Sequence, residues 1–169
     1  MPPAAQQLPQ QRQQQSKLMP ITIDLQVIDN RFELPTLMQF KGWVVAALAG
    51  RKDGVELTIR IVDEDESRTL NHTYRDMDKP TNILSFPFEA PPGVVLNLLG
   101  DLVVCAQVVN QEATQQKKPL IDHWAHMITH GCLHLMGYDH INNDDAQEME
   151  AIEIDILQRQ GINNPYVVE

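Results

Sequence analysis

The alternation of apolar and polar residues is clearest in residues 55–62, VELTIRIV. Apolar residues occupy every second position from Val55 to Ile61, with polar or charged residues between them. This period of two predicts a strand with one face buried in the core. Residues 21–27 alternate in the same way and predict a shorter strand.

Two further strands are predicted in the middle of the chain. Residues 79–89, KPTNILSFPFE, are typical of a loop that leads into a strand. Pro87 places this strand at an edge of the sheet or marks its end, because proline cannot donate a ladder hydrogen bond. Residues 100–109, GDLVVCAQVV, predict another strand that is opened by Gly100.

Four segments have the spacing or composition of helices. Apolar residues recur at helical spacing after Pro35, and the polar residues 64–73 predict a short helix. Residues 119–136 predict a helix with proline in its first turn. Residues 144–160 predict a last helix that Gly161 stops. The apolar positions of this last helix form one stripe: Ala146, Met149, Ile152 and Ile156.

The order of these elements is βαβα, then ββ, then αα, and it indicates a single α+β domain over residues 20–166. We expect a small mixed sheet of about four strands, with the helices packed mainly on one face. Residues 1–19 are rich in glutamine and proline and have little apolar surface to bury. They predict a flexible N-terminal tail, to which we assign no function.

Composition narrows the classes of function. The chain of 169 residues has a formal net charge of −10, so contact with nucleic acid needs a local basic patch or a metal. Cys105 and Cys132 provide no disulfide framework and suit a reducing compartment. The N-terminal segment lacks the apolar core of a signal peptide. The longest apolar run, residues 94–109, is too short and too polar to span a membrane. We therefore expect a cytoplasmic protein with no membrane partner.

The predicted helix over residues 119–136 carries most of the histidines. A helical projection places His123, His126, His130 and His134 on one side. The same projection places Ile121, Trp124, Ile128, Cys132 and Leu135 on the other side, toward the core. The helix is therefore predicted to have an apolar face and an imidazole face.

The spacing of these histidines predicts a metal site. Two imidazoles one turn apart can converge on one ion, which permits either His126 with His130 or His130 with His134. Gly137 can end the helix in a left-handed turn, and the chain can then bring His140 to the second pair. Three nitrogen ligands and a water describe an open, catalytic zinc site, so we expect one Zn²⁺ held by His130, His134 and His140.

Residues near these ligands receive weaker assignments. Asp139 either orients an imidazole or stabilises the turn. His126 and His123 lie one or two turns away, where each either contacts substrate or supports the site. Of the two, we assign His126 to substrate binding. Cys132 points toward the core and is not a ligand.

The spacing is that of metzincin peptidases, H-E-x-x-H-x-x-G-x-x-H, with Gly131 in place of the glutamate. In those enzymes the glutamate takes a proton from the metal-bound water. Glycine cannot do so, and zinc alone can bring the pKa of that water to about 7. Metal-assisted cleavage without a carboxylate base is easier for RNA, whose 2′-hydroxyl can act as the nucleophile.

Cleavage of a phosphodiester also needs positive charge at the transition state. Basic residues gather in the middle of the chain: Arg51, Lys52, Arg60, Arg68, Arg75 and Lys79. Arg75 and Lys79 flank a loop and are expected to form a phosphate clamp that binds substrate. The alternative is that these residues are solvated surface charges.

Three segments resemble the YbeY family of bacterial metallo-endoribonucleases: HGCLHLMGYDH at 130–140, TYRDMDKPTNILSFPFE at 73–89, and LGDLVVCAQVV at 99–109. The resemblance covers about residues 20–166. It implies an α+β fold with a zincin-like metal-binding helix and zinc on the three histidines named above. It also implies a catalytic role for Arg75 beside a zinc-bound water.

The resemblance further implies an activity and a cellular role. The activity is cleavage of single-stranded RNA, in maturation of the 3′ end of small-subunit (16S) ribosomal RNA and in late quality control of ribosomes. The implied partners are ribosomal RNA, ribosomal particles and ribosome-associated proteins in the bacterial cytoplasm.

Two other functions fit parts of the pattern. A metal-dependent peptidase or amide hydrolase is favoured by the histidine spacing and disfavoured by Gly131. A non-catalytic ribosome-assembly factor would use the metal only to brace the fold. Loss of RNA cleavage in variants that stay folded separates the endoribonuclease from this last alternative.

Overall fold

The computed structural model describes residues 20–139 and 141–167. A four-stranded mixed sheet runs through it in the order β1-β2-β4-β3. The strands are β1 (Thr22–Val27), β2 (Glu56–Val62), β3 (Ile83–Pro87) and β4 (Leu98–Cys105). β1, β2 and β4 are parallel, and β3 is the antiparallel edge strand next to β4. The predicted α+β domain with a small mixed sheet is confirmed; the predicted tail over residues 1–19 lies outside the described residues.

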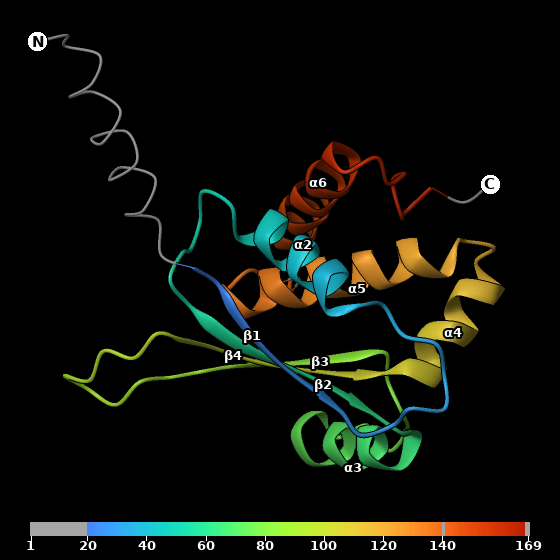
Figure 1. The fold of residues 1–169 in the computed structure, drawn as a ribbon, viewed down its shortest axis with the longest axis horizontal. Coiled ribbons are helices and arrows are strands. Elements are labelled where there is room, and N and C mark those ends of the chain that lie inside the picture. Colours follow the sequence, from blue (N-terminus) through green and yellow to red (C-terminus); the bar gives the residue numbers. More distant parts are fainter. Residues whose placement is uncertain (1–19, 140, 168–169) are drawn as a thin grey trace, which may run out of the picture.

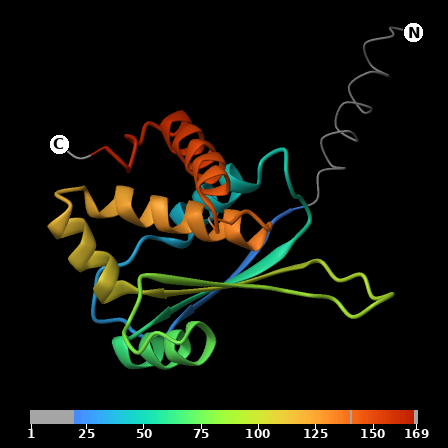
Figure 2. The same ribbon diagram turned by 180° about the vertical axis from the view of Figure 1, so that it is seen from behind.

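Helices cover the two faces of the sheet unequally (Figure 1). The helices are α2 (Leu37–Leu48), α3 (Glu64–Arg75), α4 (Ala106–Gln115), α5 (Leu120–Leu135) and α6 (Asn143–Arg159). α2, α5 and α6 lie on one side and α3 lies alone on the other, as the view from behind also shows (Figure 2). This agrees with the prediction that the helices pack mainly on one face.

The sequence sets the start of several helices through side-chain caps. Thr36 and Gln39 form a reciprocal capping box at the start of α2, which satisfies two backbone N–H groups that lack a helical partner. Asp63 caps α3 and Asn142 caps α6, each by accepting a hydrogen bond from a backbone N–H three residues later. Polar capping residues therefore mark these boundaries.

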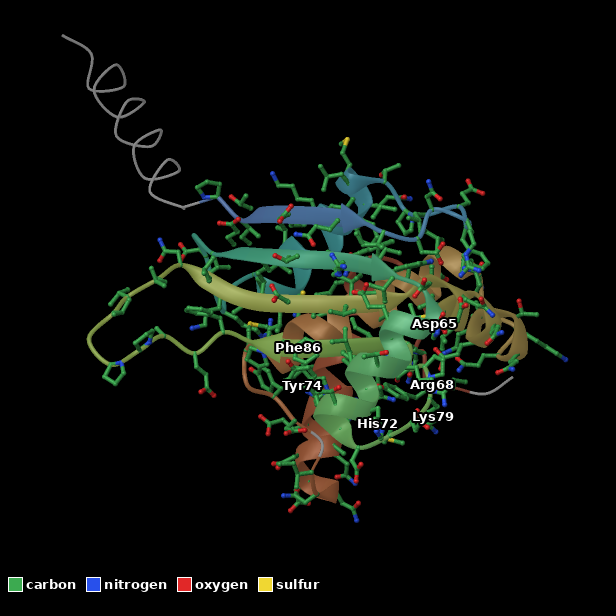
Figure 3. All side chains as sticks on the ribbon, turned by 90° about the horizontal axis from the view of Figure 1, so that it is seen from below. Asp65, Arg68, His72, Tyr74, Lys79 and Phe86 are labelled. Carbon is green, nitrogen blue, oxygen red and sulfur yellow. The ribbon has the colours of Figure 1, made fainter. Side chains whose placement is uncertain are left out.

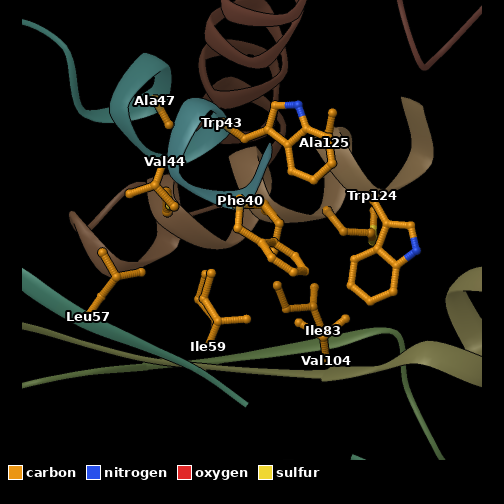
Figure 4. Packing of buried hydrophobic residues seen from close by; sticks show 14 of the residues in the cluster. Phe40, Trp43, Val44, Ala47, Leu57, Ile59, Ile83, Val104, Trp124 and Ala125 are labelled. Carbon is orange, nitrogen blue, oxygen red and sulfur yellow. The ribbon is translucent and has the colours of Figure 1, made fainter. Parts of the chain in front are cut away.

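The core lies between the sheet and the helical layer (Figure 4). Leu57 and Ile59 of β2 point into it and are essentially inaccessible to solvent. Phe40 of α2 fills the space above them and packs edge-on against both Trp43 and Trp124. Each such buried side chain contributes roughly 1.5–3 kcal/mol relative to an exposed one, so this cluster fixes α5 firmly over the sheet.

The predicted strand over residues 100–109 is wrong in its second half. The strand ends at Cys105, and residues 106–115 form α4. Ala106, Val109 and Ala113 are buried, and their spacing of three and four is helical. The run of β-branched residues concealed this change of period.

The predicted division of α5 into an apolar face and an imidazole face is confirmed for all named residues but Ile121. Successive histidine rings contact one another along one side of the helix, and Trp124, Ile128, Cys132 and Leu135 are buried. Ile121, which was assigned to the core, is 40% exposed, whereas His123 and His126 are 2% and 8% exposed. α5 is buried on most of its circumference because α2, α4, α6 and the sheet all pack against it. A helix that is covered on most sides carries apolar side chains around most of its surface. Its polar side chains are hydrogen-bonded to other protein groups.

Among residues 20–139 and 141–167, the structure has no helix with the length and apolar content needed to cross a lipid bilayer.

Candidate metal centre and adjoining groove

The C-terminal end of α5 turns sharply at Gly137, which has a φ of 99°. The backbone N–H of Tyr138 donates to Leu133 O at 3.1 Å, and that of Gly137 donates to His134 O at 3.0 Å. These two bonds define a Schellman motif, which needs a positive φ that glycine adopts easily. The predicted glycine turn is confirmed. His140, the predicted third ligand, lies outside the described residues.

His130 and His134 face each other across one turn of α5. Their Nε2 atoms are 3.0 Å apart. Two nitrogens bound to one tetrahedral zinc at ordinary Zn–N distances are about 3.3 Å apart. The pair therefore has nearly the separation that a shared ion requires.

Glu153 of α6 is a buried carboxylate that joins α6 to the histidines of α5. It is 0% exposed. Oε1 accepts a hydrogen bond from His130 Nδ1, and Oε2 accepts from His126 Nε2 at 3.2 Å and from the Tyr166 hydroxyl. Burial alone would raise the pKa of Glu153, but the hydrogen bonds from His126 and His130 outweigh it and bring the pKa to about 2.

An ionised Glu153 determines where the imidazole protons lie. A carboxylate can only accept, so His130 carries its proton on Nδ1 and His126 carries its proton on Nε2. In the neutral form of His130, Nε2 then carries the lone pair, on the nitrogen that faces His134. Metal-binding histidines commonly donate their second N–H to a carboxylate in this way.

A second grouping could also hold a metal ion. Ligand atoms of His126, His130 and Glu153 lie within 4.8 Å of one another. Burial lowers the pKa of His126, and the hydrogen bond that His126 donates to Glu153 only partly opposes this. Hydrogen bonds join the members of both groupings: Glu153 with His126 and His130, and His130 with His134. The donor sets of both groupings suit zinc, which accepts imidazole and carboxylate ligands.

A groove of about 830 Å³ opens beside His130 and His134. It crosses the edge strand β3 and reaches the end of α3 on the opposite face of the sheet. Its lining residues are Tyr74, Arg75, Asn82, Ile83, Leu84, Ser85, Phe86, Pro87, His130, His134, Gly137, Tyr138, Asp139 and Ile141. Three candidate residues from distant parts of the sequence, Arg75, His130 and His134, thus share one groove.

Two other candidate residues lie elsewhere. His126 does not line this groove; it lines a separate cavity formed with Lys118, Asp122 and the segment after α6. Lys79 is exposed in the loop after α3 and is also absent from the groove lining. Neither residue therefore lines the groove that Arg75, His130 and His134 share.

The loop between α3 and β3, residues 76–82, is held by two buried polar side chains of α3. Asn71 Nδ2 donates to Lys79 O at 2.8 Å, and Ser67 Oγ donates to Thr81 O at 3.0 Å. Asp76 ends α3 in the left-handed conformation, with a φ of 56°. These contacts fix the last turn of α3, and Arg75 with it, at the mouth of the groove.

The basic residues do not form one continuous patch. Arg60 is paired with Glu66, and Arg68 is paired with Asp78. Among the described residues, Arg75 has no carboxylate partner within ion-pair distance, so its charge is available to a ligand. Arg51 and Lys52 line a smaller cavity on the other side of Tyr138.

Gly131 has a packing role that the sequence did not reveal. A Cβ at this position would lie 2.7 Å from Ile83 Cδ1 and 2.8 Å from Leu102 Cδ2. Side-chain carbons do not approach so closely without displacement. The glycine allows α5 to pack directly on β3 and β4, so a glutamate has no room here.

The neighbouring Cys132 is fully buried, as predicted, and burial raises the pKa of its thiol to about 12.

Sequence reasoning missed both carboxylates that support the histidines. Glu112 of α4 contacts His123 Nε2 at 3.0 Å and accepts from Asn82 Nδ2. Glu153 lies on the apolar stripe of α6, one residue after Ile152. A charged residue on a buried stripe is unusual, and this was the available signal for Glu153. No comparable signal marks Glu112.

Two comparisons place the chain among known proteins. The family model described as "Endoribonuclease YbeY" matches residues 25–161. Among solved structures, the solution structure of TM1509 from Thermotoga maritima has a TM-score of 0.53 at 23% sequence identity. That match covers 87% of this chain and 95% of TM1509, and it supports the fold. The family match spans most of the chain, including the groove with His130 and His134, so the protein belongs to the YbeY family of endoribonucleases.

Proposed function

We propose that this protein is a zinc-dependent endoribonuclease that cleaves single-stranded RNA in the groove beside α5. One observation carries the proposal. The Nε2 atoms of His130 and His134 lie 3.0 Å apart, in a groove that Arg75 also lines. Paired imidazoles with a nearby guanidinium suit a reaction at a phosphodiester, where negative charge develops.

His130, His134 and His140 are the proposed ligands. The chain spacing supports His140, since the Gly137 turn reverses the direction of the backbone three residues earlier. Of the alternative group His126, His130 and Glu153, only His130 lines the groove, whereas His130 and His134 both line it. A zinc ion on the proposed ligands supplies a Lewis acid and a water of lowered pKa.

The protein's own residues orient the substrate and hold one proton in place. Glu153 keeps the proton of His130 on Nδ1, which leaves Nε2 directed toward His134. Arg75 donates hydrogen bonds to the phosphate oxygens and stabilises the negative charge that develops on them. Because Gly131 leaves no room for a carboxylate base, an RNA substrate with its own 2′-hydroxyl nucleophile suits this site better than a peptide.

We also propose the cellular substrate. The protein trims the 3′ end of precursor small-subunit ribosomal RNA and acts in quality control of defective particles in the cytoplasm, together with ribosomal particles and their associated proteins. Membership of the family supports this role. Sequencing of small-subunit RNA 3′ ends tests it: cells lacking the protein should accumulate extended ends, and unchanged ends would refute the role.

RNA cleavage by purified protein tests the biochemical proposal. Protein stripped of metal and reloaded with zinc should cut single-stranded RNA, and the stripped protein should not. His130→Ala should abolish cutting, whereas His72→Ala should not, because His72 is an exposed histidine of α3 that does not line the groove. Equal cutting by wild type and His130→Ala would contradict the proposal. Histidine-dependent cleavage of a peptide library instead of RNA would favour a peptidase.

A further inference from the structure

Two aromatic side chains form a pair at the α3 end of the groove. The rings of Tyr74 and Phe86 have centroids 5.1 Å apart and an interplanar angle of 69°. Both residues line the groove, and the view from below shows them adjacent on this face (Figure 3). Tyr74 immediately precedes Arg75, which we place on the phosphate.

The sheet presents Phe86 on the face opposite the histidines. Ser85 points toward α5, where its hydroxyl lies near Gly131 O. Phe86, the next residue in β3, therefore points toward α3. It packs against the small cluster of Val62, Leu84 and Val103. The groove thus wraps around the edge strand, with the histidines at one end and the aromatic pair at the other.

Core packing does not account for an aromatic side chain at position 74, because Tyr74 lies largely in solvent. It is 65% exposed, and it lies in the last turn of a helix whose other residues are mostly polar. A large aromatic left in water on a polar helix gains little from folding. Phe86 holds the ring of Tyr74 by an edge contact, and the structure keeps this ring at the groove.

We propose that Tyr74, supported by Phe86, is a stacking platform for one base of the RNA strand in the groove. This inference rests on the proposed function. Aromatic side chains bind single strands by stacking on bases, while basic residues follow the backbone. The order Tyr74-Arg75 supplies one group of each kind on adjacent residues.

The platform would select single strands over duplexes. A base within a helix already stacks on its neighbours, so it can reach Tyr74 only after the duplex opens at that point. An unpaired base meets no such cost. Stacking is tolerant of sequence because every base has a π-face.

Binding of a single-stranded oligonucleotide by the full-length, zinc-loaded protein tests the platform. The strand carries 2′-O-methyl groups, which remove the internal nucleophile, and its affinity is measured by fluorescence anisotropy. Tyr74→Ala should weaken binding at least about fivefold, while Tyr74→Phe, which keeps the ring, should stay within about twofold. Val95→Ala, which removes an exposed apolar residue outside the groove lining, is the control and should bind like wild type.

Two further readouts separate stacking from other effects. An abasic nucleotide moved along the strand should weaken wild-type binding at one position, and this loss should disappear in Tyr74→Ala because the two changes remove one contact. The salt dependence of binding should be unchanged in Tyr74→Ala and reduced in Arg75→Ala, by about 0.7 in the log–log slope. The melting temperature of Tyr74→Ala should match wild type.

The outcomes distinguish this inference from the proposed function. If wild type cuts RNA but Tyr74→Ala binds it equally well and no abasic position matters, the platform is refuted and the endoribonuclease proposal stands. If wild type neither binds nor cuts RNA, both are refuted.

Discussion

Glu153 accepts a hydrogen bond from His130 Nδ1 across the interface between α6 and α5. The carboxylate is fully buried, and its contact uses the ring nitrogen of His130 that does not face His134. One hydrogen bond thereby sets both the ring orientation and the tautomer of His130. The geometry of the proposed ligand pair thus depends on a residue of another helix, 23 positions later in the chain.

Removing the Glu153 carboxylate should weaken metal binding. Residues that orient a metal-binding histidine typically change metal affinity by about 10- to 100-fold when mutated. We expect Glu153→Ala to show a loss of this size and Glu153→Gln, whose amide oxygen can accept one hydrogen bond, to show a smaller one. A zinc titration against a competing chelator measures both. Glu148→Ala removes an exposed acid of the same helix and should leave zinc affinity unchanged; an equal loss there would show that charge alone matters.

Gly131 and Gly42 offer a matched pair of glycine-to-alanine changes within helices. Gly42 in α2 has no atom within 4 Å of an added Cβ, so Gly42→Ala should stabilise the protein by about 0.5–1 kcal/mol through helix propensity. At Gly131 the added methyl meets Ile83 and Leu102, both buried. Overpacking costs about 1–3 kcal/mol, so Gly131→Ala should be destabilising. Urea denaturation measures both free energies of unfolding, and equal gains would contradict the packing role of Gly131.

Much of the fold followed from the sequence because its patterns are local. The alternation in β2 and the helical spacing after Pro35 depend on residues a few positions apart. The failures occurred where distant segments meet. His123 and His126 are buried in α5 because Glu112 and Glu153 arrive from α4 and α6 to satisfy them, and no periodicity within α5 records those partners. The strand assigned to residues 106–109 failed because β-branched residues favour strands until tertiary packing decides otherwise.

The site was predicted in a similar way. The spacing of His130, His134 and Gly137 depends only on helix geometry, and the structure contains the expected pair and turn. The groove around β3, which joins Arg75 to those histidines, depends on the sheet order and could not be derived from spacing. From the sequence, Gly131 was interpreted only through its lack of a carboxylate base. Its close packing against the sheet became apparent only from the structure.

Arg75 and Arg68 provide a test of the phosphate contact. Both lie on α3, but Arg68 is paired with Asp78, whereas Arg75 lines the groove. Arg75→Ala should lower the rate of RNA cleavage by at least about tenfold, since it removes positive charge at the reacting phosphate. Arg68→Ala makes the same change in net charge and should stay within about twofold. Cleavage rates at fixed salt decide between them, and a similar loss in both would point to a general electrostatic effect.

Glu112 should contribute stability that depends on pH. Burial raises its pKa, but the hydrogen bonds from His123 and Asn82 outweigh this and lower the pKa below its ordinary value of 4.5. A carboxyl group with a lowered pKa in the folded state stabilises the protein above its unfolded pKa, and this contribution is lost as pH falls through the folded value. Glu112→Gln should therefore be less stable than wild type at neutral pH, and the difference should shrink below about pH 4.5. Thermal unfolding across this range measures the difference; a gap that widens toward acid would contradict the assignment.

The position of the ion tests the central claim most directly. Anomalous diffraction at the zinc edge, on crystals of zinc-loaded protein, locates the metal relative to each candidate ligand. We predict an ion about 2.0–2.1 Å from Nε2 of both His130 and His134. Glu153 should be hydrogen-bonded to His130 and should not coordinate the metal. An ion held by His126 and Glu153, or no ion near His134, would contradict the account.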